Sequence, residues 1–301
     1  MDFKKVGHLA KYYLEAEILG HKKPILAGFK VTYKCNLACR QCPYWRREYP
    51  ELSFNDAVKV IDQMHEAGAK LLILEGGEPL LWKDGSYTIE DLITKARESF
   101  FTVGITTNGT LPIDTEADIV WVSVDGLKET HNQLRNNSFD KIMTNLKESK
   151  HPKIFANITI NKVNVREIEA LIKFLSPIVK GITIQFFYPY EESENLALTK
   201  AERVEALDKL IGLKRAGYPL NDSVVALEVL KYNHWRCEPW MLCNGEPDGK
   251  INYGCYLKNR ITEGQEDPCK LCGFAAHTEI SLAYQGNLEA IWAGRKILDI
   301  F

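Results

Sequence analysis

Six short apolar runs, each rich in β-branched residues, alternate with stretches of helical apolar spacing along the first two thirds of the chain. The apolar runs cover residues 25–33, 70–75, 102–107, 119–124, 153–160 and 181–187. The helical stretches cover residues 54–67, 88–98, 139–149, 165–175 and 199–215. Strands that alternate with helices of this length form βα units around a parallel sheet. Because the runs are nearly continuous in apolar residues, we expect strands that are buried on both faces.

Six βα units predict an α/β fold of a particular kind, a partial (βα)6 barrel that is one strand pair short of a closed eightfold TIM barrel. After about residue 218, glycine and proline recur every few positions and break the chain into short pieces. We therefore predict three parts. They are an N-terminal amphipathic helix over residues 1–24, the partial barrel over 25–217, and a small cysteine-rich C-terminal domain over 218–301.

The N-terminal helix places apolar residues near one face, at Val6, Leu9, Tyr13 and Leu14, with several lysines around them. We expect this helix to pack over one end of the barrel. The alternative is an interfacial helix that touches a membrane or a lipid substrate.

The overall composition excludes several classes of protein. The chain has 301 residues, of which 45% are hydrophobic and 26% charged, so it can bury a full core and is not a disordered segment. Its formal net charge of −2 lacks the basic surplus of a nucleic-acid-binding protein. No apolar run reaches the 18 residues of a membrane span, and the N-terminus has no signal-peptide pattern. We expect a cytoplasmic protein, with the N-terminal helix as its one candidate for peripheral membrane contact.

The eight cysteines fall into two groups that lie far apart in the sequence. Three occur within eight positions, and the other five occur in the last quarter of the chain. A secreted disulfide scaffold would be short and would scatter its cysteines, whereas clustered cysteines in a cytosolic protein more often bind metal. The grouping therefore favours metal over disulfides.

The first group reads Cys35-x3-Cys39-x2-Cys42 and follows the first predicted strand directly. Three thiolates on one loop can bind three irons of a 4Fe–4S cubane and leave the fourth iron open for a small ligand. A zinc site would need a fourth ligand, and no other Cys or His is near in sequence. Loops at the C-terminal ends of barrel strands are where active sites form, so the position supports the same prediction.

Together with Gly76-Gly77-Glu78-Pro79 after the second strand, this loop resembles the radical S-adenosylmethionine (SAM) superfamily over roughly residues 25–215. The resemblance implies that the Gly-Gly-Glu-Pro segment receives the amino group of SAM. Glycines permit a close backbone approach, and Glu78 can accept an ammonium. Taken alone, the same four residues are equally typical of a tight turn.

The resemblance also implies SAM contacts at the ends of later strands. Asn108 follows the third strand, Ser123 ends the fourth, and Arg135 lies ten residues after Asp125. In similar enzymes, polar residues at these places contact the ribose and carboxylate of SAM. Asn-Gly and Asp-Gly pairs are also ordinary turn formers, which leaves a turn as the alternative.

One position departs from the pattern of the family. Similar enzymes often place an aromatic residue just before the third cysteine, against the adenine, and here that residue is Gln41. Tyr44 or Trp45 are candidates to replace it. The departure leaves the adenine contact open but does not affect the cluster.

The implied reaction is a reductive cleavage of SAM. An external one-electron donor of the ferredoxin or flavodoxin type reduces the cluster, and SAM is cleaved to methionine and a 5′-deoxyadenosyl radical. This radical takes a hydrogen atom from the substrate or adds to one of its carbons. The cofactor supplies the difficult chemistry while the barrel orients the substrate and excludes water. No catalytic side chain beyond the cluster is assigned.

The second cysteine group resembles the shortened auxiliary-cluster domain of radical SAM enzymes, called twitch and related to SPASM. Four residues are the candidate ligands of a second 4Fe–4S cluster, namely Cys237, Cys255, Cys269 and Cys272. Four thiolates suit a structural zinc as well. Cys243 is a fifth cysteine, which either replaces one of the four or is a buried thiol.

Three hypotheses for the function follow. The first is a radical SAM enzyme acting on a small molecule or lipid, because the overall sequence resembles the adenosylhopane synthase-like proteins. That likeness rests on Cys-Asn-Leu-Ala-Cys, Gly-Gly-Glu-Pro-Leu-Leu and the late Cys-x2-Cys-Gly. The second is a peptide- or protein-modifying maturase, which the lack of a visible leader-binding domain before residue 25 disfavours. The third is a non-catalytic iron–sulfur redox or scaffold protein, which would have no need of a SAM pocket.

Overall fold

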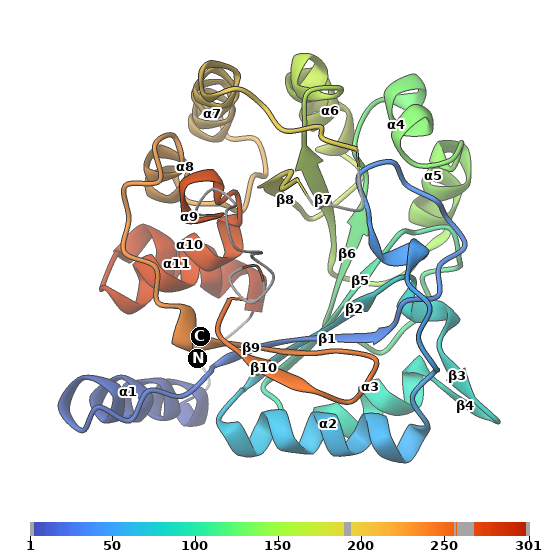
Figure 1. The fold of residues 1–301 in the computed structure, drawn as a ribbon. Helices are drawn as coiled ribbons and strands as arrows, with labels where there is room; N and C mark the ends of the chain where they lie inside the picture. Colours follow the sequence, from blue (N-terminus) through green and yellow to red (C-terminus); the bar gives the residue numbers. More distant parts are fainter. Residues whose placement is uncertain (1–2, 190–193, 256, 258–267, 299–301) are drawn as a thin grey trace.

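The computed structural model describes residues 3–189, 194–255, 257 and 268–298, and its main feature is one curved sheet of eight strands (Figure 1). Six of these strands confirm the six predicted ones, and they are β1 (Leu26–Thr32), β2 (Leu71–Gly76), β5 (Thr102–Thr107), β6 (Ile119–Ser123), β7 (Ile154–Ile160) and β8 (Gly181–Phe186). The other two are β9 (Leu242–Gly245) and β10 (Ile251–Tyr253). A separate hairpin is formed by β3 (Lys83–Asp84) and β4 (Tyr87–Thr88).

The strand order is β10-β9-β1-β2-β5-β6-β7-β8, and every neighbouring pair is parallel except β9 with β10. This is the mixed α/β fold with a largely parallel sheet that the sequence predicts, opened into a partial barrel. In a parallel sheet the carboxyl ends of the strands meet at one edge. The loops that follow β1, β2, β5 and β6 are therefore brought together there.

Helices surround the outer face of the sheet, and Figure 1 shows them as a ring. The five predicted helices correspond to α2 (Phe54–Ala67), α3 (Ile89–Arg97), α5 (Phe139–Glu148), α6 (Ile168–Leu175) and α7 (Lys200–Arg215). The sequence analysis missed the short α4 (Lys128–Leu134). The remaining helices are α1 (Phe3–Ile18), α8 (Val224–Leu230), α9 (Pro268–Leu271), α10 (Ala275–Tyr284) and α11 (Leu288–Leu298).

The strands alternate between a fully apolar outer face and a mixed inner face. On β7, Ala156, Ile158 and Ile160 belong to the main hydrophobic core beneath the helices. The residues between them, Asn157 and Thr159, face the barrel interior and stay partly exposed. The expectation of strands that are apolar on both faces is therefore correct for the outer face and wrong for the inner one. A polar inner face is what an interior that admits solvent or a ligand requires.

The C-terminal part contacts both edges of the open sheet. At one edge, β9 pairs with β1 and carries β10. At the other edge, the backbone N–H of Phe186 at the end of β8 donates a hydrogen bond of 3.0 Å to the carbonyl of Gly273. A Cβ on Gly273 would lie 2.5 Å from the Cβ of Phe186, so glycine is required for this close approach. The sheet thus crosses the predicted boundary at residue 218, and the division into domains stays a prediction.

The N-terminal helix α1 packs against the C-terminal part through a different face from the one predicted. Leu9, Tyr12 and Ala16 join Met241 and Tyr284 in a small apolar cluster. Tyr13 lies at the margin of this face, 47% exposed with its ring 5.5 Å from that of Tyr284, whereas Leu14 is 53% exposed and lies outside the cluster. In the described part of the chain, no helix is both long enough and apolar enough to cross a membrane.

Candidate metal and cofactor site

The first cysteine group lies on the loop after β1, at the carboxyl edge of the sheet. Hydrogen bonds hold this loop in a fixed conformation. The indole N–H of Trp45 donates to the carbonyl of Cys39 at 3.1 Å, and the backbone N–H of Arg40 donates to the carbonyl of Leu134 at 3.1 Å. The Arg40 guanidinium also makes a two-point ion pair with Glu194, at 2.8 and 3.0 Å. This pair connects the cysteine loop to the segment after β8.

The three thiols of this loop lie close enough to influence one another's ionisation. Burial is the main cause that raises the pKa of Cys39 to about 12, and the neighbouring Cys42 and Cys35 contribute to the rise. Burial also raises the pKa values of Cys35 and Cys42. The positive charge of Arg135 acts in the opposite direction, with its Nη1 3.9 Å from the Cys39 sulfur. The site therefore keeps its thiols protonated until a metal displaces the protons.

Gly76 and Gly77 press the end of β2 onto the end of β1. Gly76 has a φ of +137°, and a Cβ there would lie 2.2 Å from the carbonyl oxygen of Thr32. A Cβ on Gly77 would lie 2.3 Å from the carbonyl oxygen of Lys34. The backbone N–H groups of Gly77 and Glu78 donate to these two carbonyls at 2.7 and 2.8 Å. The glycines thus serve close backbone packing between the strands, which fixes the start of the cysteine loop.

Glu78 is fully buried, and both of its carboxylate oxygens accept hydrogen bonds from the protein. Oε1 accepts from the Thr107 hydroxyl at 2.8 Å and from the Leu80 N–H at 3.1 Å, while Oε2 accepts from the Asn108 N–H at 2.7 Å. Burial is the main cause that raises the pKa of this carboxyl. Pro79 follows as the first residue of a buried 3-10 turn. In this structure Glu78 joins the ends of β2 and β5, and the predicted contact with a ligand ammonium stays a prediction.

Asn108 connects the end of β5 to the first cysteine. Its Nδ2 donates to Asn36 Oδ1 at 2.8 Å and lies 3.7 Å from the Cys35 sulfur, while its Oδ1 accepts from Thr110. Ser123 ends β6 and is buried. Both residues thus lie at the carboxyl edge where the sequence analysis predicts them, and Asn108 lies directly beside a thiol.

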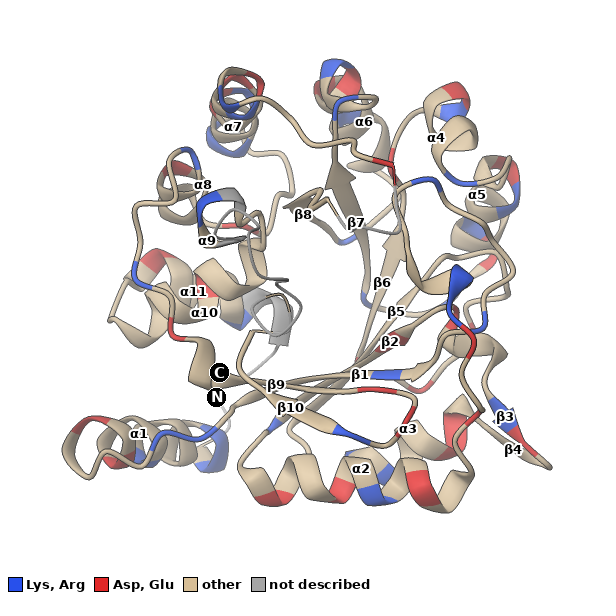
Figure 2. Cartoon of the chain, in the orientation of Figure 1, with Lys and Arg blue, Asp and Glu red and all other residues tan. Residues whose placement is uncertain are grey.

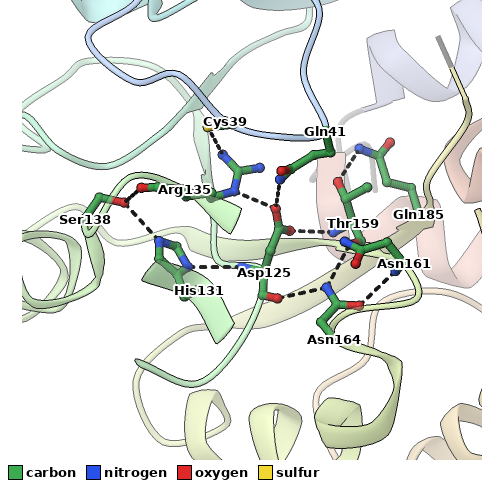
Figure 3. A network of polar contacts seen from close by, with 10 residues as sticks. All are labelled: Cys39, Gln41, Asp125, His131, Arg135, Ser138, Thr159, Asn161, Asn164 and Gln185. Carbon is green, nitrogen blue, oxygen red and sulfur yellow. Dashed lines mark hydrogen bonds and ion pairs between the residues drawn. The ribbon is translucent and has the colours of Figure 1, made fainter. Parts of the chain in front are cut away.

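Asp125, two residues beyond the end of β6, is the centre of a buried polar network (Figure 3). Its Oδ2 accepts from Arg135 Nε at 2.5 Å and from Gln41 Nε2 at 2.6 Å, and its Oδ1 accepts from the Thr159 N–H at 2.7 Å. Its backbone carbonyl accepts from Asn164 Nδ2 at 2.8 Å. The network joins the cysteine loop to β6, β7 and α4.

His131 and Ser138 form the outer end of the same network. The Asp125 N–H donates to His131 Nδ1 at 3.2 Å, and the other ring nitrogen lies 3.0 Å from the Ser138 hydroxyl. Burial is the main cause that lowers the pKa of His131, to about 4. The neutral imidazole of His131 therefore accepts a hydrogen bond from the Asp125 N–H, and this bond supports the turn that carries the carboxylate.

The sequence analysis named Arg135 and Gln41 but missed Asp125 as the residue that joins them. It treated Asp125-Gly126 as a turn former. A signal was present, because Asp125 follows the largely apolar run 119–124, where a charged residue needs a partner. Arg135 ten residues on is that partner, although only the structure shows that Gln41 contacts the same carboxylate.

A second charged group faces the barrel interior near β1. Figure 2 shows that charged residues lie mainly on the surrounding helices. Lys30 on β1 is buried nonetheless, with its ammonium 3.1 Å from Glu75 and 3.8 Å from Glu246. The Tyr33 hydroxyl donates a short hydrogen bond to Glu246. The sequence analysis missed this group, because Lys30 and Glu75 lie inside runs that read as apolar strands.

Three cysteines of the second group come together beyond the edge of β8. Burial is the main cause that raises the pKa of Cys272 to about 11, and the nearby Cys255 and Cys269 contribute to the rise. Arg203 on α7 donates hydrogen bonds to the Cys272 carbonyl and to the Leu230 carbonyl, and it thereby holds this loop on α7 and α8. Cys237 is partly buried before a 3-10 turn at Pro239–Met241, and its predicted role as a ligand stays a prediction.

Cys243 is a buried thiol of β9. It belongs to the main hydrophobic core, and burial alone raises its pKa to about 12. The structure therefore supports the buried-thiol alternative for Cys243.

His277 on α10 stacks on Phe274 with ring centroids 5.0 Å apart.

The donor sets fit the groups that they are predicted to hold. In the described residues, no three His, Cys, Asp or Glu side chains surround a single point closely enough to bind one metal ion. A cubane takes one thiolate on each of its irons, so its ligands need not converge on one point. Three thiols on one loop, one of them 3.9 Å from the Arg135 guanidinium and with no carboxylate among the donors, suit an iron–sulfur cluster.

Comparisons with known proteins agree with this site. Residues 29–175 match the family model described as the radical SAM superfamily. Fe-coproporphyrin III synthase of Methanosarcina barkeri is 33% identical over 191 residues, which are 58% of this chain and 45% of that protein. The sporulation killing factor maturation protein SkfB of Bacillus subtilis is 30% identical over 165 residues, which are 50% of this chain and 39% of that protein. This chain thus spans less than half the length of either relative.

Among solved structures, SuiB of Streptococcus suis bound to SAM superposes with a TM-score of 0.65 at 14% identity. The superposition covers 97% of this chain and 71% of that one, which shows a shared fold. The match to this family implies a 4Fe–4S cluster and SAM. Over residues 29–175 the chain is thus similar to radical SAM proteins, and its fold is the one that SuiB has.

Proposed function

We propose that this chain holds a 4Fe–4S cluster through Cys35, Cys39 and Cys42, and that it binds SAM beside the buried Arg135–Asp125 pair. The observation that carries the proposal is that three thiols on one loop lie at the carboxyl edge of the sheet beside this pair, with Arg135 Nη1 3.9 Å from the Cys39 sulfur. When bound, the cluster and SAM supply a 5′-deoxyadenosyl radical after one electron arrives from an external donor of the ferredoxin or flavodoxin type. That radical abstracts hydrogen from the substrate or adds to it.

The chain's own residues position and tune these groups. Arg135 brings a positive charge to Cys39 and so favours its thiolate form, and Asp125 fixes the guanidinium in place. Asn108 directs its amide N–H groups toward Cys35 and Asn36, which orders the other end of the loop. Ser123 and Asn108 remain the candidates for contacts with the ribose and carboxylate of SAM, and Gly76, Gly77, Glu78 and Pro79 for the region of its amino group.

The substrate that we propose is a small molecule bound in the barrel interior. An aromatic floor is formed by Trp121 and Phe155, whose ring centroids lie 6.3 Å apart. Beside it on the inner face, Asn157 and Thr159 of β7 contact Thr183 and Gln185 of β8 through side-chain hydrogen bonds of 3.2 and 3.1 Å. A surface with one aromatic part and one amide and hydroxyl part suits a partly polar molecule better than a bare hydrocarbon chain. The likeness to adenosylhopane synthase-like proteins, and with it a lipid substrate, stays a prediction.

A peptide substrate is the second candidate. SkfB is named as a maturation protein for a killing factor, and SuiB has also been solved with its precursor peptide. The first of these likenesses is in sequence and the second is in fold. Incubation with peptide pools and with small-molecule extracts distinguishes the two classes, because only a true substrate accelerates SAM cleavage.

For the second cysteine group we propose an auxiliary 4Fe–4S cluster of the twitch type held by Cys237, Cys255, Cys269 and Cys272. The mutual influence of Cys255, Cys269 and Cys272 supports it. A structural zinc bound by the same four thiolates is the alternative. Metal analysis of the reconstituted protein decides between iron and zinc.

Peripheral membrane contact through α1 is a further part of the proposal. Phe3, Leu14 and Ile18 lie on its outward side with 80%, 53% and 72% of their surfaces exposed, and Lys4 and Lys11 flank them. Apolar side chains beside basic ones are typical of helices that lie on anionic lipid. Co-sedimentation with anionic vesicles tests this contact, with Leu14→Glu as the variant expected to abolish it.

The experiment that tests the proposed function is a SAM-cleavage assay. Anaerobically reconstituted protein is incubated with SAM and a strong chemical reductant, and 5′-deoxyadenosine is measured. We expect 5′-deoxyadenosine from the wild type and none above background from Cys39→Ala. Cys243→Ala is the matched control, because it removes a thiol that lies in the hydrophobic core. Absence of 5′-deoxyadenosine from the fully reconstituted wild type would overturn the proposal.

A further inference from the structure

Two exposed residues of the cysteine loop are hydrogen-bonded to the backbone of two of its cysteines. The indole N–H of Trp45 donates to the Cys39 carbonyl at 3.1 Å, and Arg46 Nη1 donates to the Cys42 carbonyl at 3.1 Å. Trp45 is 36% exposed, and Arg46 is exposed as well. The Arg46 guanidinium lies 4.2 Å from the centre of the Trp45 ring, so the two side chains stack. One stacked pair thus reaches from solvent to the backbone of two predicted cluster ligands.

The surface around this pair has the composition of a protein interface. Tyr49 is 49% exposed, with its ring 5.0 Å from that of Tyr33. Lys34 is exposed, and it lines one surface depression together with Arg47 and Tyr49. Tryptophan, tyrosine and arginine are the residue types that contribute most of the binding energy at protein interfaces. We call this surface the aromatic–basic patch, and its members are Lys34, Trp45, Arg46, Arg47 and Tyr49.

The local charge of the loop is opposite in sign to that of the whole chain. Residues 34–47 contain four basic residues and no acidic one, whereas the chain has a formal net charge of −2. Figure 2 shows basic positions on this loop between β1 and α2. Arg40 is paired with Glu194, which leaves the three basic residues of the patch. Glu48 and Glu51 lie at its margin, so a positive excess remains. Such an excess steers an acidic partner to this part of the surface.

We propose that the aromatic–basic patch is the docking surface for the external electron donor, a small acidic one-electron carrier protein. This inference rests on the proposed function, which requires such a donor. The reduced carrier gives up one electron to the cluster predicted at Cys35, Cys39 and Cys42, and no atom is transferred. A carrier docked here contacts Trp45 and Arg46, which are themselves bonded to the backbone of two of these cysteines. A single layer of side chains then separates the carrier from the cluster ligands.

Calorimetric titration of the anaerobically reconstituted protein with an oxidised flavodoxin, and with an oxidised 2Fe–2S ferredoxin, measures docking without turnover. Arg46→Glu should weaken binding of the carrier about 10-fold, because a like charge then faces the acidic partner. Raising the salt concentration from 0.05 to 0.3 M should weaken binding to the wild type more than binding to this variant.

Lys150→Glu is the matched control. It lowers the formal net charge from −2 to −4, as Arg46→Glu does. Lys150 is exposed shortly before β7, at the amino edge of the sheet and therefore on the side opposite the cysteine loop. This variant should bind the carrier as the wild type does. The inference is overturned if neither carrier binds the wild type, or if Arg46→Glu and Lys150→Glu bind equally well.

A second readout compares two sources of electrons for SAM cleavage. The rate of 5′-deoxyadenosine formation with the reduced carrier is divided by the rate with a strong chemical reductant, which needs no docking surface. This ratio should fall about 10-fold in Arg46→Glu and stay unchanged in Lys150→Glu. Equal loss with both reductants would mean that Arg46 acts on the cluster itself, which contradicts the inference. Absence of 5′-deoxyadenosine from the wild type with the chemical reductant would instead overturn the proposed function.

Discussion

The two cysteine groups of this chain are built in different ways. The first lies on a loop that contacts Asn108 after β5 and Leu134 and Arg135 at the end of α4, and Asp125 fixes the Arg135 guanidinium. The second lies beyond the edge of β8, where Arg203 and Asn233 donate hydrogen bonds to the carbonyls of Cys272 and Lys270. The difference indicates that the first site is shaped before any metal binds. The second site depends more on metal to fix its conformation.

The largest predicted effect concerns the thiols themselves. Replacing Cys35, Cys39 and Cys42 together by Ala should reduce SAM cleavage to background, because no thiolate remains for the cluster. Replacing Cys269 and Cys272 by Ala should leave SAM cleavage measurable and reduce protein stability instead. Assay of 5′-deoxyadenosine and thermal unfolding of both variants measure the two effects. Equal loss of cleavage in both would contradict the distinction between the groups.

Breaking the Asp125–Arg135 pair should lower the free energy of unfolding strongly. Asp125→Asn leaves the guanidinium, which is 12% exposed, without its countercharge. Loss of one partner of a buried ion pair destabilises by about 3 to 5 kcal/mol. Denaturant unfolding measures this cost, with Glu169→Gln as the control. Glu169 pairs with Lys173 on the surface of α6, and its loss should leave stability almost unchanged.

A pH dependence is expected in the C-terminal part of the molecule. Glu279 on α10 is buried beside Asp222, and burial is the main cause that raises its pKa to about 8 from its ordinary value of 4.5. The folded state therefore binds a proton that the unfolded state has already released. The contribution of Glu279 to stability should therefore fall as pH rises from about 4.5 to about 8.

Glu279→Gln removes this titration and should flatten the pH dependence over the same range. Thermal unfolding of both proteins at pH 5, 6.5 and 8 checks it. The variant should be the more stable protein at pH 8. The same pH dependence in the wild type and in Glu279→Gln would show that Glu279 titrates normally.

The smallest effect is expected for the exposed ion pair between Arg40 and Glu194. The two side chains are 32% and 48% exposed, so the pair should contribute no more than about 1 kcal/mol to stability. Arg40→Ala should remove this contribution, and with it the part of the stability that depends on salt. Unfolding of the wild type and the variant at 0.05 and 0.5 M salt measures both effects. A cost above 2 kcal/mol would mean that the cysteine loop depends on this pair for its conformation.

Much of the fold could be predicted from the sequence because outer-face residues such as Ile158 and Ile160 carry the strand signal. The inner face was less predictable. Lys30 and Glu75 neutralise each other across two strands, and no periodicity reveals such a pair in advance. The short α4 was missed because its seven residues span too few turns for a clear apolar period.

The candidate site could be predicted at the level of motifs but not of contacts. The spacing of Cys35, Cys39 and Cys42 is local and therefore visible in the sequence. The contact between Gln41 and Asp125 joins residues 84 positions apart, and only the fold brings them together. The role of Gly76 and Gly77 in strand packing likewise depends on the neighbouring strand, which the motif alone does not include.

The measurement that tests the central claim most directly is the iron and sulfide content of the anaerobically reconstituted protein. The wild type is compared with the variant in which Cys35, Cys39 and Cys42 are all replaced by Ala. Two clusters predict about eight irons in the wild type and about four in the variant. About four irons falling to none would confirm the first cluster and exclude the second. A wild-type iron content that these three replacements leave unchanged would contradict the account.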